Sequence, residues 1–259
     1  MTFDLTLLSI IAPAFVVSLL VVVTHVPLGL EVLKRGIIFI DLATAQIAGL
    51  GAVAATLYVG EVHSFEDLII VNLFAFSAAL LAGLFFSWIE KRLRKYQEAL
   101  IGGAFVLAAS MALLVLANQP LGNEEFRDLL AGQILFVSWL QIGLIALIYL
   151  PIMAIWFRFR EKFQHLGFYM IFAIVVTASV QVVGVYLVFA TLIFPALAAW
   201  GLPEKRRLAA AYGVAGVGLL AGLITSLLTD YPTGPTLVWS LALAALLGAL
   251  WFYRRARAA

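Results

Sequence analysis

Asp41 is a carboxylate within a run of apolar and small residues, RGIIFIDLATAQIAGLG (residues 35–51), and the amide Gln46 follows it by five positions. A carboxylate is a ligand for hard divalent cations, and its charge offsets part of the cost of stripping water from such an ion. An amide oxygen contributes only a dipole, so it is a weak ligand suited to hard ions or to their waters. This pair of residue types could therefore form a weak site for a hard cation.

The spacing of Asp41 and Gln46 leaves their arrangement open. On an ideal α-helix the two side chains point about 140° apart, which leaves Asp41 to act alone. A π-bulge would instead bring residue 46 beneath residue 41. A structural explanation also remains open, in which Asp41 is hydrated at the membrane interface or pairs with Arg35. The small residues after Asp41 would then serve only close helix packing.

Other segments supply further polar groups at membrane depth. His25, in VTHVPLG, follows the first apolar run and could complete a His–Asp pair across two helices, or could instead be an interfacial histidine bonded to a backbone carbonyl. Gln181 precedes Gly184, where a break in the helix would free backbone carbonyls to line a cavity. We expect Gln181, Gly184 and Pro195 to lie along a transport pathway.

The composition places these residues in a membrane. Hydrophobic residues make up 64% of the 259 residues and charged residues 12%, and the mean hydropathy is +1.10. An average soluble domain has about 45–50% apolar and about 25% charged residues. The absence of cysteine excludes disulfides and thiolate metal sites. A net charge of +2 is too small to indicate nucleic acid as a partner.

The fold class predicted from the apolar runs is all-α, a polytopic bundle of eight or nine transmembrane helices in one transmembrane domain, residues 1–259. A span needs about 20 apolar residues. The stretch from Gly167 to Trp200 is too long for one span and short for two, so we expect a broken helix pair interrupted at Gly184 and Pro195. The remaining predicted spans are 5–27, 36–60, 68–89, 99–117, 134–157, 208–229 and 235–253. The first has no basic residue before it and no cleavage site after it, so we expect it to be retained.

The basic residues predict the orientation, because they accumulate in cytoplasmic loops. If the loop with Lys34 and Arg35 is inside and Gly167–Trp200 goes out and returns, 15 of the 16 basic residues lie on one side and Arg127 alone lies on the other. The N-terminus is then outside, the C-terminus is inside, and nine crossings result. The number is eight if Gly167–Trp200 only partly re-enters.

Three segments together resemble the permease subunit of bacterial zinc/manganese ABC importers. They are PLGLEVLKRGIIFIDLATAQIAGLG (27–51), SVQVVGVYLVFATLIFPALAA (179–199) and DYPTGP (230–235). The resemblance implies a permease homodimer in the bacterial inner membrane, two cytoplasmic ATP-binding subunits and an extracytoplasmic solute-binding protein. It also implies zinc or manganese as the transported ion, with ATP bound only by the partner subunit and no covalent cofactor.

The sequence departs from the pattern of that family at the position four residues after the second-span aspartate. Family members typically have histidine there, on the same helix face as the aspartate, whereas this chain has Ala45. High-affinity zinc coordination within the span is therefore not expected, and a permease for a metal chelate or another small solute remains an alternative. An intramembrane enzyme finds little support, because the chain has no HExxH, no GxSxG and no cysteine nucleophile.

Coupling to an ATPase must use the inner loops. FRFREKFQHLG (157–167) could form a short basic amphipathic helix, and Ile89–Leu100 is a second candidate. An ordinary inner loop against lipid headgroups would have the same charges. The chain contains no GxxxxGK[ST] loop, so we expect a transport subunit without ATPase activity of its own. The candidate coupling residues are Arg158, Arg160, Glu161, Lys162 and His165.

Overall fold

A computed structural model describes the chain except for residues 1–4, 61–63, 117–131, 133, 160–164 and 259. The part it describes is helical and contains no strand, and eight of its helices are long and apolar enough to cross a membrane. The fold is therefore the all-α membrane type that the sequence predicts. The helices are α1 (Leu5–Arg35), α2 (Ile40–Val59), α3 (Phe65–Arg92), α4 (Gln97–Leu116), α6 (Trp139–Phe159), α7 (Leu166–Ala199), α8 (Glu204–Thr229) and α9 (Thr233–Ala258), with short 3₁₀ turns η1 (Arg94–Tyr96) and η2 (Ile134–Phe136).

The chain forms two compact units, each built from separate pieces of the sequence. Unit 1 comprises residues 1–35, 131–151 and 182–259, and unit 2 comprises residues 36–130 and 152–181. The division passes through α6 next to Pro151 and through α7 three residues before Gly184, so both helices contribute to both units. That residues 1–259 act as a single permease domain stays a prediction.

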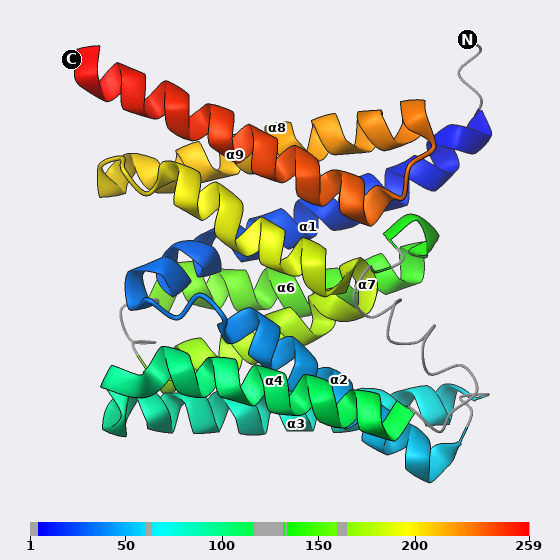
Figure 1. Cartoon of the computed structure of the whole chain (residues 1–259). Helices are drawn as coiled ribbons and strands as arrows, with labels where there is room; N and C mark the ends of the chain where they lie inside the picture. Colours follow the sequence, from blue (N-terminus) through cyan, green and yellow to red (C-terminus); the bar gives the residue numbers. More distant parts are fainter. Residues whose placement is uncertain (1–4, 61–63, 117–131, 133, 160–164, 259) are drawn as a thin grey trace. The chain divides into compact units, whose positions relative to one another are not determined.

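In unit 1, α8 and α9 pack side by side (Figure 1) and α1 packs against α8. Gly218 and Gly222 face Leu241 and Leu237 of α9, and a β-carbon at either glycine would come within about 3 Å of that backbone. Such small residues let membrane helices approach closely where no hydrophobic effect drives them together. The turn between the two helices begins at Asp230, which adopts the left-handed conformation with φ of 56°.

The junction of α1 and α8 depends on a proline. Pro27 has no N–H, so the carbonyl of Val23, four residues earlier, loses its partner within the helix. The hydroxyl of Tyr212 on α8 donates to this carbonyl at 2.9 Å. In a bilayer a freed carbonyl must find a partner within the protein, and here a neighbouring helix provides it.

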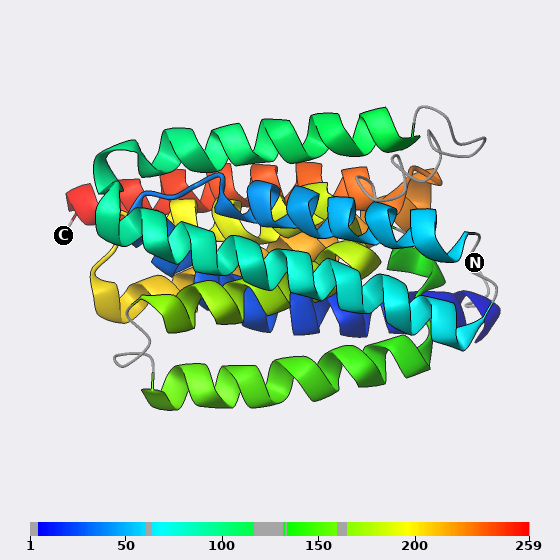
Figure 2. The same cartoon turned by 90° about the horizontal axis from the view of Figure 1, so that it is seen from below.

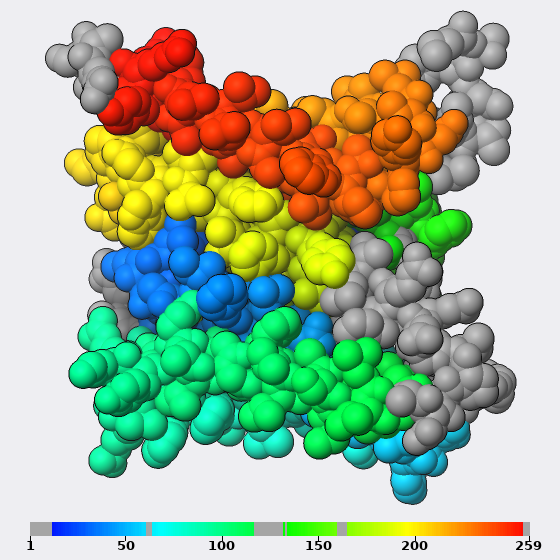
Figure 3. All heavy atoms as spheres, viewed as in Figure 1, coloured from blue at the N-terminus to red at the C-terminus, as the bar shows by residue number. Residues whose placement is uncertain are grey.

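Unit 2 is organised around α2, which contacts both α3 and α4 (Figures 1 and 2). The contact with α3 is close because Gly51 lies against the carbonyl of Phe74, where a β-carbon would be 2.7 Å away. Ala48, Ala79 and Ala173 form a small core among α2, α3 and the first half of α7. Figure 3 shows α4, teal to green, along the surface. Exposed side chains of α4, such as Leu107 and Leu114, are apolar, as lipid contact requires.

The break predicted in α7 is confirmed at Gly184 and is wrong at Pro195. Gly184 has φ of 78° and ψ of 162°, a conformation essentially restricted to glycine, and it divides α7 into two helical segments. Gly132, with φ of 72°, lies against the backbone of Val183 and Gly184, where a β-carbon would overlap it. Pro195 instead lies inside a helix that continues to Ala199. A proline removes one hydrogen bond, and the helix here tolerates that loss without leaving helical dihedral angles.

Candidate functional site

Asp41 lies in the first turn of α2, and only 2% of its surface is exposed. Both of its carboxylate oxygens are buried, and neither has a hydrogen-bond partner among the described residues. The first turn of a helix leaves N–H groups without carbonyl partners, so this end of α2 carries partial positive charge that favours an anion. The helix start thus permits a buried carboxylate, while the oxygens keep their capacity to bind a cation.

The helix around Asp41 is regular α-helix from Ile40 to Val59, so the π-bulge that would bring Gln46 beneath Asp41 is absent. Gln46 is nonetheless buried, with 3% of its surface exposed. Ala45, four residues after Asp41, is buried as well and supplies no ligand. Within the described part of the chain, no group of three or more His, Asp or Glu side chains gathers into a metal site.

His25, in α1 of unit 1, is fully buried and its ring is fixed through one nitrogen. Nδ1 lies 2.8 Å from the carbonyl oxygen of Val21 and 2.9 Å from Oγ1 of Thr24. A carbonyl only accepts, so Nδ1 carries the proton and Nε2 carries the lone pair. Nε2 is buried and has no hydrogen-bond partner in the described structure. Metal-binding histidines usually show this pattern, with the second nitrogen donating to a carbonyl or carboxylate.

Sequence reasoning missed Glu98, in the first turn of α4. Its Oε1 accepts the backbone N–H of Phe39, the residue before α2, at 3.2 Å, and its Oε2 is buried without a partner in the described residues. Glu98 therefore lies beside the start of the helix that carries Asp41. The signal in the sequence was an acidic residue at the start of an apolar helix, QEALIGG, which ordinarily indicates only a favourable helix terminus.

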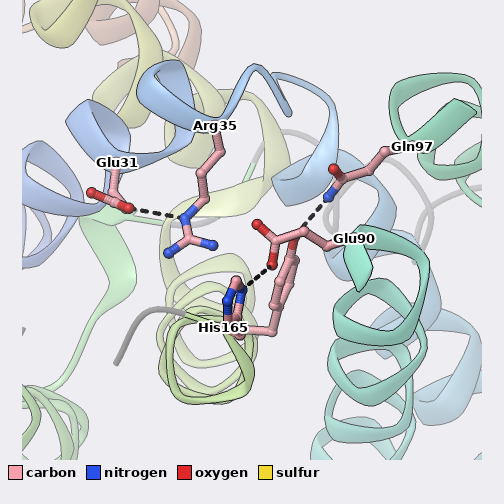
Figure 4. Close-up of polar contacts among 6 residues, drawn as sticks. Glu31, Arg35, Glu90, Gln97 and His165 are labelled. Atoms are coloured by element: carbon pink, nitrogen blue, oxygen red, sulfur yellow. Dashed lines mark hydrogen bonds and ion pairs between the residues drawn. The ribbon is translucent and has the colours of Figure 1, made fainter. Parts of the chain in front are cut away.

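The same end of unit 2 contains two further polar contacts between helices (Figure 4). His165 Nδ1 lies 3.2 Å from Glu90 Oε2 at the end of α3, and Gln97 donates to the Tyr169 hydroxyl at 2.6 Å. Both contacts tie the start of α7 to the helices beside the loop that precedes α4. Figure 4 also shows the ion pair between Arg35 and Glu31 within α1, with Nε and Oε1 at 2.9 Å.

The other predicted site residues are spread through both units. Gln181 is exposed at the end of unit 2, whereas Gly184 and Pro195 are buried in unit 1. Arg158 is exposed with its guanidinium over the ring of Phe159, and His165 is exposed apart from its contact with Glu90. The remaining predicted coupling residues, Arg160, Glu161 and Lys162, lie outside the described residues.

Comparison with known proteins gives a family and a fold. The sequence model of the ABC 3 transport family matches residues 8–168 and 159–252. No curated protein sequence matches the chain. Among solved structures, the chain is similar to one titled "PsaBC from Streptococcus pneumoniae in complex with Fab", at 16% identity and a TM-score of 0.72. The match covers 92% of this chain and 90% of that one, so the likeness in fold extends over nearly the whole chain.

Proposed function

The chain belongs to the ABC 3 transport family, and from this membership we propose that it is the membrane permease of an ABC importer that moves a divalent metal cation, zinc or manganese, into the cytoplasm. The chain is a multi-pass membrane protein, and it carries no ATP-binding loop of its own. The energy therefore comes from separate cytoplasmic ATP-binding subunits. The membrane is the bacterial inner membrane, with the N-terminus outside and the C-terminus in the cytoplasm.

The observation that carries this proposal is the buried, unpartnered carboxylate of Asp41. Ionisable groups inside spans are costly, about 2.5–3.5 kcal/mol on insertion scales, and they mark ion and substrate pathways. A dication that sheds water inside the bundle gains a full negative charge at Asp41. Because few other anionic ligands surround the ion, it also leaves readily, as transport requires.

Gln46 is the supporting ligand from α2 in this proposal, and His25, which belongs to unit 1, stays a ligand predicted from the sequence alone. His25 offers Nε2, the nitrogen that its contact with Val21 leaves unprotonated. Gln46 offers an amide oxygen from the same helix as Asp41, on a different face, and acts through the ion's waters. The pathway continues along Gln181 and the break at Gly184, with Pro195 beyond it, where freed backbone carbonyls supply further oxygens.

The partners in this proposal are a second copy of the chain, two ATP-binding subunits and a solute-binding protein that delivers the ion from outside. The segment from Arg158 to His165 is the proposed contact for the ATP-binding subunit. The contact between His165 and Glu90 supports this choice, because it ties the end of this segment to α3 within unit 2. A movement of this segment would therefore be transmitted to the end of α3.

The decisive test is uptake of radioactive Zn²⁺ or Mn²⁺ by Asp41→Asn in vesicles that also contain the ATP-binding subunit. The change keeps the volume of the side chain and removes its charge, so uptake should fall to background while membrane insertion and subunit association persist. Leu42→Asn is the matched control. It introduces an amide at the adjacent residue of the same turn and leaves the charge of Asp41 in place. Normal uptake by Asp41→Asn would contradict the proposal.

A permease for a metal chelate is the second candidate, and Ala45 favours it. With Ala45 four residues after Asp41, this span offers a bare zinc ion no nitrogen ligand on the face of Asp41. Competition distinguishes the two functions. An excess of free ion suppresses uptake in an importer of the bare cation, whereas only the intact chelate suppresses uptake in an importer of chelates.

A further inference from the structure

One end of unit 1 brings the start of α8 and the end of α9 together. The two helices are antiparallel, and Gly218 lies against Leu241 while Gly222 lies against Leu237, which fixes their register. The same register places Arg255, near the end of α9, beside the first turn of α8. Figure 1 shows the end of α9, in red, at the same end of the unit as the turn between α7 and α8, in yellow.

Two arginines at this end of unit 1 lie over tryptophan rings. The guanidinium of Arg207 lies 4.6 Å from the ring centre of Trp200. The guanidinium of Arg255 lies 4.2 Å from the ring centre of Trp251. Nε of Arg207 also donates to the carbonyl of Leu202 at 2.7 Å. A ring covers one face of a guanidinium, whereas the N–H donors point outward in its plane. Both cations are therefore held in place with donors left for a ligand.

The surroundings of these two arginines are basic. Lys205, Arg206 and Arg254 are exposed beside them, and Glu204 is the one acid in residues 200–207 and 251–255. No acidic side chain in the described part of the chain pairs with either arginine. The negative end of α9 favours a cation such as Arg255, but it uses none of the donors in the guanidinium plane. An anion from outside the chain would complete this arrangement.

The depth of the two tryptophans indicates which anion that is. Trp200 directly follows the span that ends at Ala199, and the span of α9 ends at Arg255. Tryptophan is enriched at the level of the lipid headgroups, and the guanidinium fork matches the oxygens of a phosphate. We propose that Arg207 on Trp200 and Arg255 on Trp251 form one site for the headgroup phosphate of an anionic phospholipid, which joins α8 to α9. The surrounding positive charge favours a headgroup without an amine. The inference does not depend on which ion is transported.

The experiment measures the midpoint of thermal unfolding of the full-length chain in detergent micelles, with either phosphatidylglycerol or phosphatidylcholine added. Saturating phosphatidylglycerol should give a midpoint about 5 °C above that in phosphatidylcholine, because a ligand of the folded state stabilises it. Arg207→Gln combined with Arg255→Gln should abolish this difference. Comparing two lipids for each variant removes any effect of the substitutions on stability itself.

Arg92→Gln combined with Arg94→Gln is the matched control. It removes two exposed arginines from unit 2 and lowers the net charge equally, so the difference between the lipids should persist. Loss of the difference in this control would overturn the proposal, because the lipid would then respond only to net charge. Trp251→Leu keeps every charge and should reduce the difference, since Arg255 loses the ring that holds it. A full difference in Trp251→Leu would contradict the paired site.

The remaining outcomes concern other occupants of this surface. An unchanged lipid difference in the Arg207→Gln, Arg255→Gln protein would overturn the proposal. If that protein also fails to associate with the ATP-binding subunit, the surface belongs to a protein partner instead. Inorganic phosphate that raises the wild-type midpoint as much as phosphatidylglycerol does would indicate a site for a soluble anion and would also overturn it. No effect of inorganic phosphate supports the lipid.

Discussion

His25 shows how a single residue can be prepared for a ligand by contacts within its own helix. Its Nδ1 donates to Val21, which fixes both the tautomer and the plane of the ring, and this leaves Nε2 as an acceptor in a buried position. Asp41 is prepared differently, by the N–H groups of the helix end where it lies. His25 offers a nitrogen ligand and Asp41 offers oxygen ligands, so the two residues should contribute unequally to the affinities for different metal ions.

Changing His25 should therefore alter metal preference. Imidazole suits zinc, whereas carboxylate and water suit manganese. We expect His25→Ala to lower the affinity for Zn²⁺ about tenfold or more and the affinity for Mn²⁺ much less, measured by competition in the assembled transporter. Thr24→Val is the control, because it removes a contact of Nδ1 and leaves Nε2 in place. Equal losses for the two ions would indicate that His25 only maintains the structure of α1.

Tyr212 gives a prediction about stability rather than transport. Tyr212→Phe leaves the carbonyl of Val23 without a partner, and we expect the free energy of unfolding in detergent to fall by about 1 kcal/mol. In a Pro27→Ala background the restored N–H can bond to Val23 within the helix, so the same change should cost much less. An equal cost in both backgrounds would show that the interhelical hydrogen bond does not depend on the proline.

The element that differs most from a plain spanning helix is α7. It extends over 34 residues with one non-helical position, Gly184, which Gly132 covers closely from another segment of unit 1. The break exposes backbone groups that a regular helix would satisfy internally. In a membrane such groups persist only where the protein or a water-filled cavity surrounds them, which is why this element belongs to the proposed pathway.

Replacing Gly184 tests the break directly. Gly184→Ala forces a β-carbon into dihedral angles that other residues rarely adopt, at a cost of about 1–3 kcal/mol in the free energy of unfolding. Gly216→Ala, at a helical position of α8 with nothing within 4 Å, should be neutral or stabilising because alanine is the better helix former. Thermal unfolding of the two variants measures the difference. A Gly184→Ala protein as stable as Gly216→Ala would show that the break relaxes freely.

At the scale of the whole molecule, the charge pattern and the membrane together determine orientation. The 15 basic residues assigned to one side predict that this side faces the cytoplasm. The assignment depends on an even number of crossings between Lys162 and Lys205. Between these two residues the structure has one helix, α7, with a kink at Gly184, so the number of crossings stays a prediction.

Labelling of single cysteines measures the orientation, and the natural chain has no cysteine to interfere. Cysteines replacing Lys162 and Lys205 should react with an impermeant maleimide only from the cytoplasmic face, and a cysteine replacing Glu124 only from the outer face. If residues 162 and 205 react from opposite faces, residues 167–200 cross the membrane an odd number of times. The predicted position of either the N-terminus or the C-terminus would then be wrong.

The sequence by itself determined the fold class, most helix positions and the break at Gly184, and it predicted Asp41 as a site residue. These follow from local causes: apolar runs of membrane length, the backbone freedom of glycine and the cost of a charge in lipid. Only the tertiary structure decided that Pro195 does not interrupt α7, that Val23 bonds to Tyr212, and that Glu98 shares the start of α2 with Asp41. Glu98 and Phe39 are 59 residues apart, and spacing along a chain does not encode which helix ends meet after packing.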